Sequence, residues 1–410
     1  MTTGPITTQC AIAGGGPAGM MLGFLLARAG IDVVVLEKHA DFLRDFRGDT
    51  IHPSTLEIMY ELGILDDFLK RPHQEVRTLA GQIGDERVTL ADFSHLPTHC
   101  RFIALMPQWD FLDFLAEQAR RFPGFHLMMR ARVTDLVMED GRVLGLQAET
   151  PDGPLEIRAD LVVGADGRHS DVRMRAGLKV EDFGAPMDVI WFRLSKHVSD
   201  GQQLLGRIQA GVVFVTLDRG DYWQCAYVIP KGGFEWLRSR GLEAFRAAIA
   251  GLNPEFADRL QEIASWDDLK LLTVTVDRLK RWSRPGLLCI GDAAHAMSPV
   301  GGVGINLAIQ DAVAAANLLW QPLSKGRVPA AQLASVQARR EWPTKMMQAV
   351  QLFIQKRVIS NVLSLTERPK PPFAVTLFNR FPLLRRFPAR LIGLGFRPEH
   401  VQSPELKPSR

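Results

Sequence analysis

The segment CAIAGGGPAGMMLGFLLARAGIDVVVLE, residues 10–37, decides the fold of this chain. Residues 9–13 are predicted as a buried strand, residues 17–29 as a helix, and residues 31–36 as a second, β-branched strand. Between the first strand and the helix, residues 14–19 (GGGPAG) satisfy the spacing G-x-G-x-x-G. Glycines there allow a sharp turn and the close approach of a pyrophosphate, to which the helix N-terminus presents positive potential. The segment therefore predicts a βαβ unit that binds a dinucleotide.

An acidic residue at the end of the second strand supports this prediction. Glu37 lies about 20 positions beyond the glycines, where a carboxylate accepts hydrogen bonds from a ribose. The alternative is a glycine-rich turn without a ligand. The residues predicted to contact the dinucleotide in this unit are Gly14, Gly16, Ala18, Gly19, Glu37 and Lys38.

Two later segments narrow the choice of dinucleotide, because G-x-G-x-x-G alone does not separate NAD from FAD. Residues 160–173 (DLVVGADGRHSDVR) read as a strand that ends in Asp166-Gly167. Residues 287–311 (LLCIGDAAHAMSPVGGVGINLAIQD) read as a strand that ends in Gly291-Asp292, followed by a glycine-rich loop and a helix.

In this order the three segments resemble the dinucleotide-binding, DG and GD motifs of the single-component FAD-dependent aromatic hydroxylases. These are the group A flavoprotein monooxygenases with the p-hydroxybenzoate hydroxylase fold, and the motifs span residues 9 to about 320. The resemblance implies FAD as cofactor, with NADPH or NADH as a transient co-substrate because only one G-x-G-x-x-G is present. It also implies that O2 and a flavin C4a-hydroperoxide hydroxylate an aromatic or phenolic, hydrophobic substrate.

The resemblance assigns further site residues. Asp292 is expected near the ribityl chain or pyrophosphate, and Asp166 is expected to contact both cofactors. Pro299 and Gly302 form the flavin-ring environment, where no acid or base is assigned, and Ser298 departs from the family's common double proline. Backbone N–H groups at the following helix N-terminus would meet the flavin N1/O2 edge, where the reduced ring is negative. The remaining cofactor contacts implied are Arg47, Gln108, Val133, Gly304, Ile305 and Asn306.

The expected fold class is α/β (α+β), with a discontinuous Rossmann-like FAD-binding domain over residues 1–180 and 277–325. Residues 181–276 are predicted as an inserted mixed-sheet substrate domain, to which strands within residues 75–105 contribute. Residues 326–410 are predicted as a C-terminal helical and basic amphipathic segment. Helices are expected near Ser54–Leu69, Gln108–Arg121, Leu242–Leu260 and Gly304–Leu319.

The substrate is expected to lie against the inserted sheet. Side chains on a strand alternate between the two faces, so about half of the candidates face the pocket, and the sequence does not say which half. Packing in the core is the alternative for each aromatic. The candidates are Trp191, Arg193, Phe214, Trp223, Gln224, Cys225 and Tyr227.

Composition limits the other possibilities. Four cysteines without C-x-x-C spacing indicate neither a disulfide framework nor a metal site, so no metal is expected. No signal peptide or membrane-spanning run is visible, which favours a cytoplasmic protein. The net charge is +4, and residues 366–410 hold nine Lys or Arg against three Glu, so a nucleic-acid surface over the main body is not expected.

Several alternatives stay open at this point. The chain could be an FAD-dependent reductase or dehydrogenase of a hydrophobic or isoprenoid-like substrate, or a non-catalytic FAD-binding partner protein, because fold does not dictate activity. Residues 366–410 could dock on the body, contact a protein, or attach the chain to the inner face of a membrane. The sequence does not indicate the oligomeric state.

Overall fold

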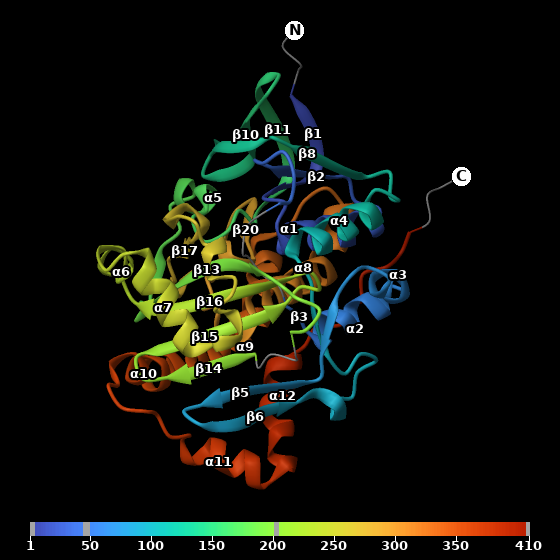
Figure 1. Cartoon of the computed structure of the whole chain (residues 1–410). Coiled ribbons are helices and arrows are strands. Elements are labelled where there is room, and N and C mark those ends of the chain that lie inside the picture. Colours follow the sequence, from blue (N-terminus) through green and yellow to red (C-terminus); the bar gives the residue numbers. More distant parts are fainter. Residues whose placement is uncertain (1–4, 44–49, 201–204, 407–410) are drawn as a thin grey trace.

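Two β-sheets, each covered by helices, build the protein. The structure is a computed structural model that describes residues 5–43, 50–200 and 205–406. Figure 1 shows the N-terminal sheet in the upper part, the second sheet across the middle and lower parts, and the C-terminal helices at the lower end.

The first sheet has the order β19-β20-β11-β1-β2-β8, with β9 and β10 paired beside β11. From β20 to β8 neighbouring strands run parallel, so their carboxyl ends meet at one edge. Its strands are β1 (Ile6–Ala13), β2 (Val33–Glu37), β8 (Phe125–Met129), β9 (Arg132–Glu139), β10 (Arg142–Thr150), β11 (Gly153–Gly164), β19 (Ser283–Arg284) and β20 (Leu287–Cys289).

Three helices belong to this sheet. Helix α1 (Pro17–Arg28) packs against α4 (Gln108–Ala119) and α8 (Gly304–Ser324), and most positions of α8 are buried. In the described part of the chain, Val300–Ser324 is long and apolar enough to cross a membrane, but most of its apolar stretch lies inside the protein. The predicted helices at these three places are confirmed, with ends shifted by a few residues.

The second sheet has the order β17-β13-β16-β15-β14-β5-β6. One face is covered by α6 (Phe234–Ser239) and α7 (Leu242–Leu252), and we call the opposite face the inner face. Its strands are β5 (Thr78–Ile83), β6 (Glu86–Asp92), β13 (Met187–Ser195), β14 (Gly206–Gln209), β15 (Val212–Asp218), β16 (Tyr222–Pro230) and β17 (Lys270–Leu272).

Two predicted helices are shorter than expected. The helix expected over Ser54–Leu69 is divided into α2 (Pro53–Glu61) and α3 (Leu65–Leu69), because Gly63 between them has φ +69° and ends the first helix. The helix expected over Leu242–Leu260 ends at Leu252, since Pro254 disfavours helical backbone at the residue before it.

Two smaller sheets and a short helix lie outside the two main sheets. One small sheet has three strands and the other has two. They are β3 (Thr50–Ile51), β4 (Gln74–Val76) and β7 (Ile103–Leu105), then β12 (Val180–Asp182) and β18 (Asp277–Leu279), and α5 (Asp171–Arg175).

The C-terminal residues form a chain of helices that covers the inner face of the second sheet. Helix α9 (Ala330–Phe353) continues through the π-helical segment η7 (Ile354–Ile359) into α10 (Ser360–Ser364), and α11 (Phe373–Arg380) and α12 (Arg386–Leu394) follow. Helices α11 and α12 pack on β6, and Ala389 and Gly393 are buried there. The docking alternative for this segment is therefore confirmed.

A buried ionic network joins α8, α9 and the segment after α12. The Asp311 carboxylate contacts His295 and accepts hydrogen bonds from Arg340 Nε at 3.0 Å and the Gly291 N–H at 3.1 Å. Arg340 Nη1 also lies 3.3 Å from Glu399. Burial alone would raise the pKa of Asp311, but His295 and Arg340 outweigh it and hold the pKa below its ordinary value.

We predict that Arg340→Met destabilises the fold by about 3–5 kcal/mol, because it removes the buried cation that the Asp311 and Glu399 carboxylates share. The matched variant Arg339→Met removes a half-exposed arginine that pairs with the same Glu399 and should cost less than about 1 kcal/mol. Urea denaturation followed by circular dichroism gives both free energies of unfolding. Equal decreases in the free energy of unfolding in the two variants would contradict the central role of the buried Arg340 network.

Candidate functional site

The three motif segments meet at the carboxyl edge of the first sheet. The Gly14 N–H donates to the Leu36 carbonyl at 2.8 Å, and Gly14 lies so close to β11 that a Cβ there would be 2.4 Å from the Ala165 oxygen. A Cβ on Gly291 would be 3.0 Å from that of Ala18. The turn after β1 therefore touches both the DG segment and the GD segment.

The turn itself is crowded on one side and open on the other. A Cβ on Gly19 would lie 1.9 Å from the Gly14 oxygen, whereas a Cβ on Gly16 would meet nothing within 4 Å. Gly16 is also the N-cap of α1, and no side chain caps that helix. The open side thus presents backbone N–H donors and the positive end of the helix, which suits a phosphate.

Glu37 is held by the backbone beside this turn. Its carboxylate accepts hydrogen bonds from the Gly15 N–H at 3.1 Å and the His39 N–H at 3.0 Å. These bonds fix the carboxylate at the end of β2, directly beside the turn. Lys38 is exposed beside it, and Val133 is half-buried on β9, near the point where the Ala131 N–H binds the Glu37 carbonyl at 2.9 Å.

The DG and GD segments bring two carboxylates and an arginine to the same edge. Asp166 accepts hydrogen bonds from Ser170 Oγ and, at 3.1 Å, from the Val172 N–H, and burial raises its pKa. Asp292 lies 3.4 Å from Arg168 Nη2. Nη1 of Arg168 is buried and has no hydrogen-bond partner among the described residues.

Sequence reasoning did not assign Arg168, although its position directly after Asp166-Gly167 gave a signal. A buried guanidinium donor of this kind fits an anionic ligand group.

The Asn306 side chain connects the start of α8 to the segment around the start of α2 by hydrogen bonds. Its amide oxygen accepts from the His52 N–H at 2.9 Å and Thr55 Oγ1 at 2.8 Å, and its amide nitrogen donates to the carbonyls of Thr50 at 3.1 Å and Gly302 at 3.3 Å. These four bonds use the whole capacity of the side chain. Any contact of Asn306 with a cofactor would therefore be made by its backbone.

The loop before α8 has a backbone that needs glycine. Gly301 and Gly302 have φ +79° and +63°, and a Cβ on Gly302 would lie 2.3 Å from Thr50 Oγ1. The Gly302 N–H donates to the Pro299 carbonyl at 3.0 Å, and no side chain caps α8 at Val303. The N–H groups of the first turn, including those of Gly304 and Ile305, therefore form a second positive helix end.

Glutamines of α9 and η7 hold the segment before this loop. Gln348 donates to the Ala296 carbonyl at 3.2 Å. Gln351 accepts from the Ser298 N–H at 3.2 Å and donates to the carbonyls of Ser298 at 3.0 Å and Val300 at 2.8 Å. Gln355 donates to Ser298 Oγ. Ser298, at the departure from the family's double proline, is thus fixed by two glutamines.

Three of the seven substrate candidates, Trp191, Arg193 and Gln224, lie on the inner face of the second sheet. Trp191 packs with Val300 of the flavin-loop segment in one hydrophobic cluster. Arg193 is exposed, 4.8 Å from the Tyr222 ring and 6.0 Å from the Trp109 ring at the start of α4. Trp109 follows Gln108, so Arg193 lies near another of the predicted cofactor positions.

The other four candidates, Phe214, Trp223, Cys225 and Tyr227, lie on the opposite face. Phe214 and Trp223 contact Phe256 with ring centroids 6.5 and 6.1 Å apart, and Tyr227 contacts Phe245 at 5.3 Å. They fill the core beneath α6 and α7, where Cys225 also lies. The expectation that Phe214, Trp223 and Tyr227 line the substrate pocket is therefore corrected, because strand alternation points them away from Val300.

Arg47, one of the predicted cofactor contacts, lies outside the described residues.

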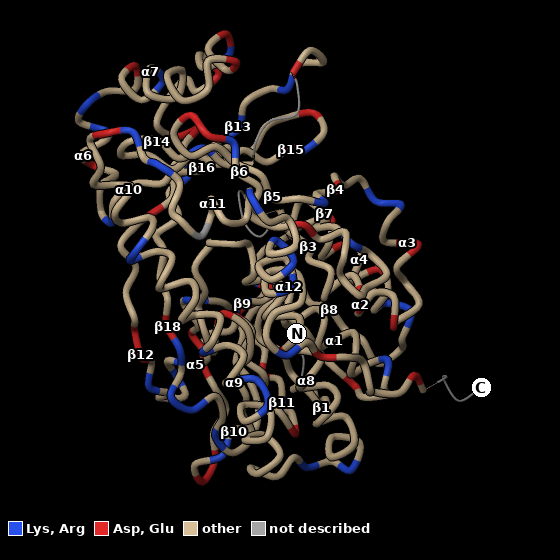
Figure 2. The backbone as a smooth tube through the Cα atoms, turned by 90° about the horizontal axis from the view of Figure 1, so that it is seen from below, with Lys and Arg blue, Asp and Glu red and all other residues tan. Residues whose placement is uncertain are grey.

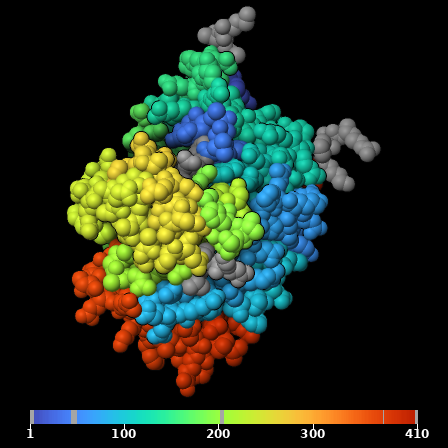
Figure 3. All heavy atoms as spheres, viewed as in Figure 1, coloured from blue at the N-terminus to red at the C-terminus, as the bar shows by residue number. Residues whose placement is uncertain are grey.

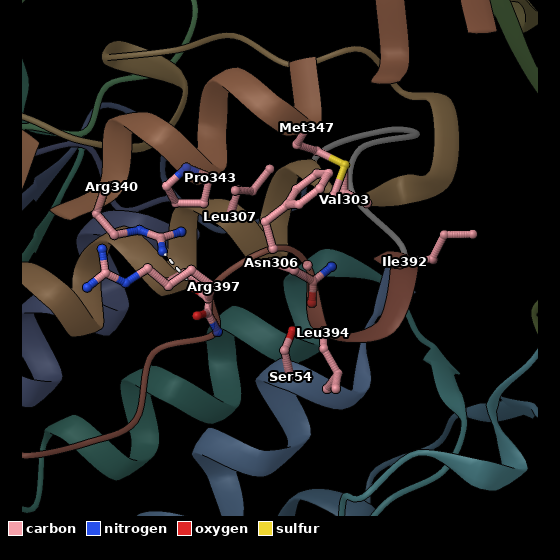
Figure 4. A pocket seen from close by; sticks show the side chains of 13 residues that line it. Ser54, Val303, Asn306, Leu307, Arg340, Pro343, Met347, Ile392, Leu394 and Arg397 are labelled. Carbon is pink, nitrogen blue, oxygen red and sulfur yellow. Dashed lines mark hydrogen bonds between the residues drawn. The ribbon is translucent and has the colours of Figure 1, made fainter. Parts of the chain in front are cut away.

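Figure 4 shows a small cavity between α8, α9 and the segment after α12. Asn306, Arg340, Met347 and Ile392 are among its lining residues, and its volume is about 30 Å³. That is the space of about one water molecule, which is too small for an aromatic ring.

The chain matches the family model described as FAD binding domain over residues 7–350. It is 33% identical to 6-methylpretetramide 4-monooxygenase of Streptomyces rimosus, over 97% of this chain and 94% of that enzyme. It is 28% identical to dialkyldecalin synthase of Streptomyces rugosporus, over 76% of this chain but only 64% of that longer protein. The crystal structure of p-nitrophenol 4-monooxygenase from Pseudomonas putida has the same fold, with a TM-score of 0.76, 21% identity, and coverage of 96% and 100% of the two chains.

We predict that Gly16→Ala raises the FAD dissociation constant by about tenfold or more and changes the stability of the FAD-free protein by less than about 0.5 kcal/mol. The added methyl group meets no protein atom but occupies the open side of the turn. The matched variant Gly19→Ala should instead destabilise the FAD-free protein by about 1–3 kcal/mol, since its Cβ meets backbone. Flavin fluorescence titration and thermal unfolding measure the two effects, and unchanged FAD affinity in Gly16→Ala would contradict the assignment.

Proposed function

Because the chain belongs to the FAD-binding domain family and its relatives are FAD-dependent aromatic monooxygenases, we propose that it hydroxylates a hydrophobic aromatic or phenolic substrate with FAD, NAD(P)H and O2. The observation that carries this proposal is the meeting of the three motif segments at one sheet edge. That edge combines an open glycine turn, the Glu37 carboxylate and an arginine with a buried donor that has no partner among the residues described.

The residues present fit four parts of FAD. The pyrophosphate would lie over Gly16 and the N-terminus of α1, near Arg168. Glu37 would accept hydrogen bonds from the adenosine ribose, and Asp292 those of the ribityl hydroxyls. The ring would lie beside Pro299, with its N1/O2 edge at the N-terminus of α8.

In this arrangement the chain's own residues bind, orient and exclude water. When bound, FAD supplies the redox and oxygen chemistry. The positive end of α8 would favour negative charge on the bound ring, and its backbone donors would need no reorganisation because Asn306 already holds this helix start in place. The cluster of mainly apolar side chains on the inner face of the second sheet would keep water from the reacting centre. Trp191 and Arg193 remain the proposed substrate contacts.

Two other activities on this fold are separable from hydroxylation. One relative is called a synthase and not a monooxygenase, namely dialkyldecalin synthase. Membership of this family therefore does not by itself establish oxygenation. A reductase would consume NAD(P)H and reduce its substrate without incorporating oxygen, and a non-catalytic partner would show no turnover.

We predict that phenols, quinols or polycyclic aromatics accelerate NADPH or NADH oxidation by the holoenzyme, with equimolar O2 uptake. Oxygen from ¹⁸O2 should appear in the product by mass spectrometry, and anaerobic samples should give none. NAD(P)H consumption that leaves every tested aromatic unlabelled would overturn hydroxylation, and substrate reduction under the same conditions would establish the reductase alternative.

We also propose that residues 368–398, named here the tail, bind an anionic lipid surface, which would bring the protein to the inner face of a membrane. The tail contains seven Lys or Arg and no Asp or Glu. Figure 2, which views this end of the molecule, colours its basic residues blue. Large apolar side chains are exposed on it, with Phe373 at 82%, Leu383 at 69% and Phe387 at 76%.

The shape and charge of the tail favour lipid over a second copy of the chain. Helix α11 forms the lower end of the molecule, as Figure 3 shows, so the apolar side chains project from a convex surface. A two-fold dimer would place the same patch on itself and bring its cations together. An anionic bilayer instead attracts them by about 1 kcal/mol each and accepts phenylalanine rings without requiring a matching groove.

We predict that the protein co-sediments with phosphatidylglycerol-containing vesicles at low salt and is released at high salt. The double variant Phe373→Ser/Phe387→Ser should lose most of this binding, while Trp236→Ser, which removes an exposed aromatic on α6, should bind as wild type does. No co-sedimentation of the wild type at low salt would exclude the lipid proposal. Self-association abolished by the double variant would assign the patch to a second copy instead.

A further inference from the structure

Two buried polar atoms lack partners where the second sheet meets the flavin-loop segment. Trp191 Nε1 and Gln355 Oε1 are buried, and neither has a hydrogen-bond partner among the described residues. One is a donor and the other an acceptor. Buried polar atoms are nearly always paired in folded proteins, so an unpaired donor and acceptor close to one site indicate a ligand that pairs with them.

Gln355 reaches this interface from η7. The residue is fully buried, and its amide nitrogen donates to Ser298 Oγ, which in turn accepts from the Val300 N–H at 3.2 Å. Its amide oxygen therefore lies within a few ångströms of the loop that contains Pro299. Isolated π-helical turns occur frequently at functional sites, and this one places Gln355 beside that loop.

Trp191 reaches the same interface from β13. Its indole packs in the cluster that contains Val300 from the loop and Ile354 and Ile359 from η7. Val300 next to Pro299, and Ile354 and Ile359 of η7, thus share one hydrophobic cluster with Trp191. The cluster joins β13, the loop and the π-helical turn that carries Gln355.

The surroundings of this pair are apolar and carry little charge. Alternation along β13, β15 and β16 gives an inner face of Met187, Val189, Trp191, Arg193, Ser195, Val213, Val215, Leu217, Tyr222, Gln224, Ala226, Val228 and Pro230. Arg193 is the charged residue of this set, and Lys270, opposite Trp191 on β17, lies on the same face. Both are exposed: Arg193 lies over the Tyr222 ring, and Lys270 Nζ donates to the Asp267 carbonyl at 2.8 Å. Among the described residues of these strands, an anionic substrate would therefore meet no buried cation, whereas a neutral ring system would be well accommodated.

We propose that Gln355 and Trp191 orient a neutral phenolic substrate beside Pro299. The Gln355 amide oxygen accepts a hydrogen bond from a ring hydroxyl, and the Trp191 indole N–H donates to a second oxygen, a ring carbonyl or hydroxyl. This inference rests on the proposed function and narrows its substrate class to uncharged phenols that carry a hydrogen-bond acceptor.

Three probes test the donor and the acceptor separately. 2-Hydroxyanthraquinone offers both a hydroxyl and a carbonyl, 2-methoxyanthraquinone lacks the hydroxyl donor, and 2-naphthol lacks the carbonyl. Their dissociation constants for the oxidised holoenzyme follow from perturbation of the flavin absorbance. A site built for a hydroxyl rejects an analogue without it, so wild type should bind the hydroxy probe roughly 10–100-fold more tightly than the methoxy probe.

The variants assign each preference to one side chain. Gln355→Met should reduce the hydroxy-to-methoxy ratio to within about threefold while the methoxy probe binds as before. Trp191→Phe should weaken 2-hydroxyanthraquinone more than 2-naphthol. Gln337→Met removes a partly buried glutamine of α9 whose oxygen accepts from the Trp282 N–H and whose nitrogen donates to the Lys280 carbonyl, and it should keep the wild-type ratio.

The outcomes separate this inference from the proposed function. A wild-type ratio near one, binding of none of the probes, or an unchanged ratio in Gln355→Met would overturn the orienting role. Hydroxylated product from the same preparations would in that case leave the monooxygenase activity standing. Conversely, if the dissociation constants of the probes show the expected ratios but no oxygen is incorporated, the binding site stands and hydroxylation is overturned.

Discussion

The close approach of the backbone at Gly14 to the end of β11 is the constraint on which the rest of the structure depends. The Ala165 N–H donates to the Ala13 carbonyl at 2.8 Å, and Gly14, with φ +104°, turns the chain against Ala165 with no room for a side chain. This contact aligns the carboxyl ends of β1 and β11, and the Ile290 N–H bond to Gly164 at 3.0 Å adds β20. The phosphate-facing turn, both carboxylates and the start of α8 are positioned by that alignment.

Much of this architecture could be predicted because its signals are local. The βαβ unit, the strands before the DG and GD motifs and the helix after the glycine-rich loop each occupy a short window with a clear period. Two helix predictions were too long, because Gly63 and Pro254 end the helices earlier than the sequence pattern indicates. In both places the apolar periodicity continues past the helix end, but the backbone preference of the glycine or proline decides where the helix stops.

The rest depends on tertiary contacts that a sequence window does not contain. Alternation divides the strand residues of the second sheet into two sets, but only the packing of α7 identifies the set with Phe214 and Trp223 as core. The bonds of Asn306 to Thr50, His52 and Thr55 join segments some 250 positions apart. Likewise, the unpaired donor of Arg168 becomes visible only once Asp292 is seen to occupy the other side of its guanidinium.

At Ser298, where the chain departs from the family's double proline, hydrogen bonds from other elements fix the backbone. A second proline would fix the backbone of this segment by its own ring and would remove an N–H donor. Here the Ser298 N–H and carbonyl are both bonded to Gln351, and its hydroxyl to Gln355. The family match ends at residue 350, so both glutamines lie beyond it. The shape of the flavin-ring environment therefore depends on α9 and η7, and side chains outside the shared motifs can set substrate preference while the motifs continue to define the cofactor site.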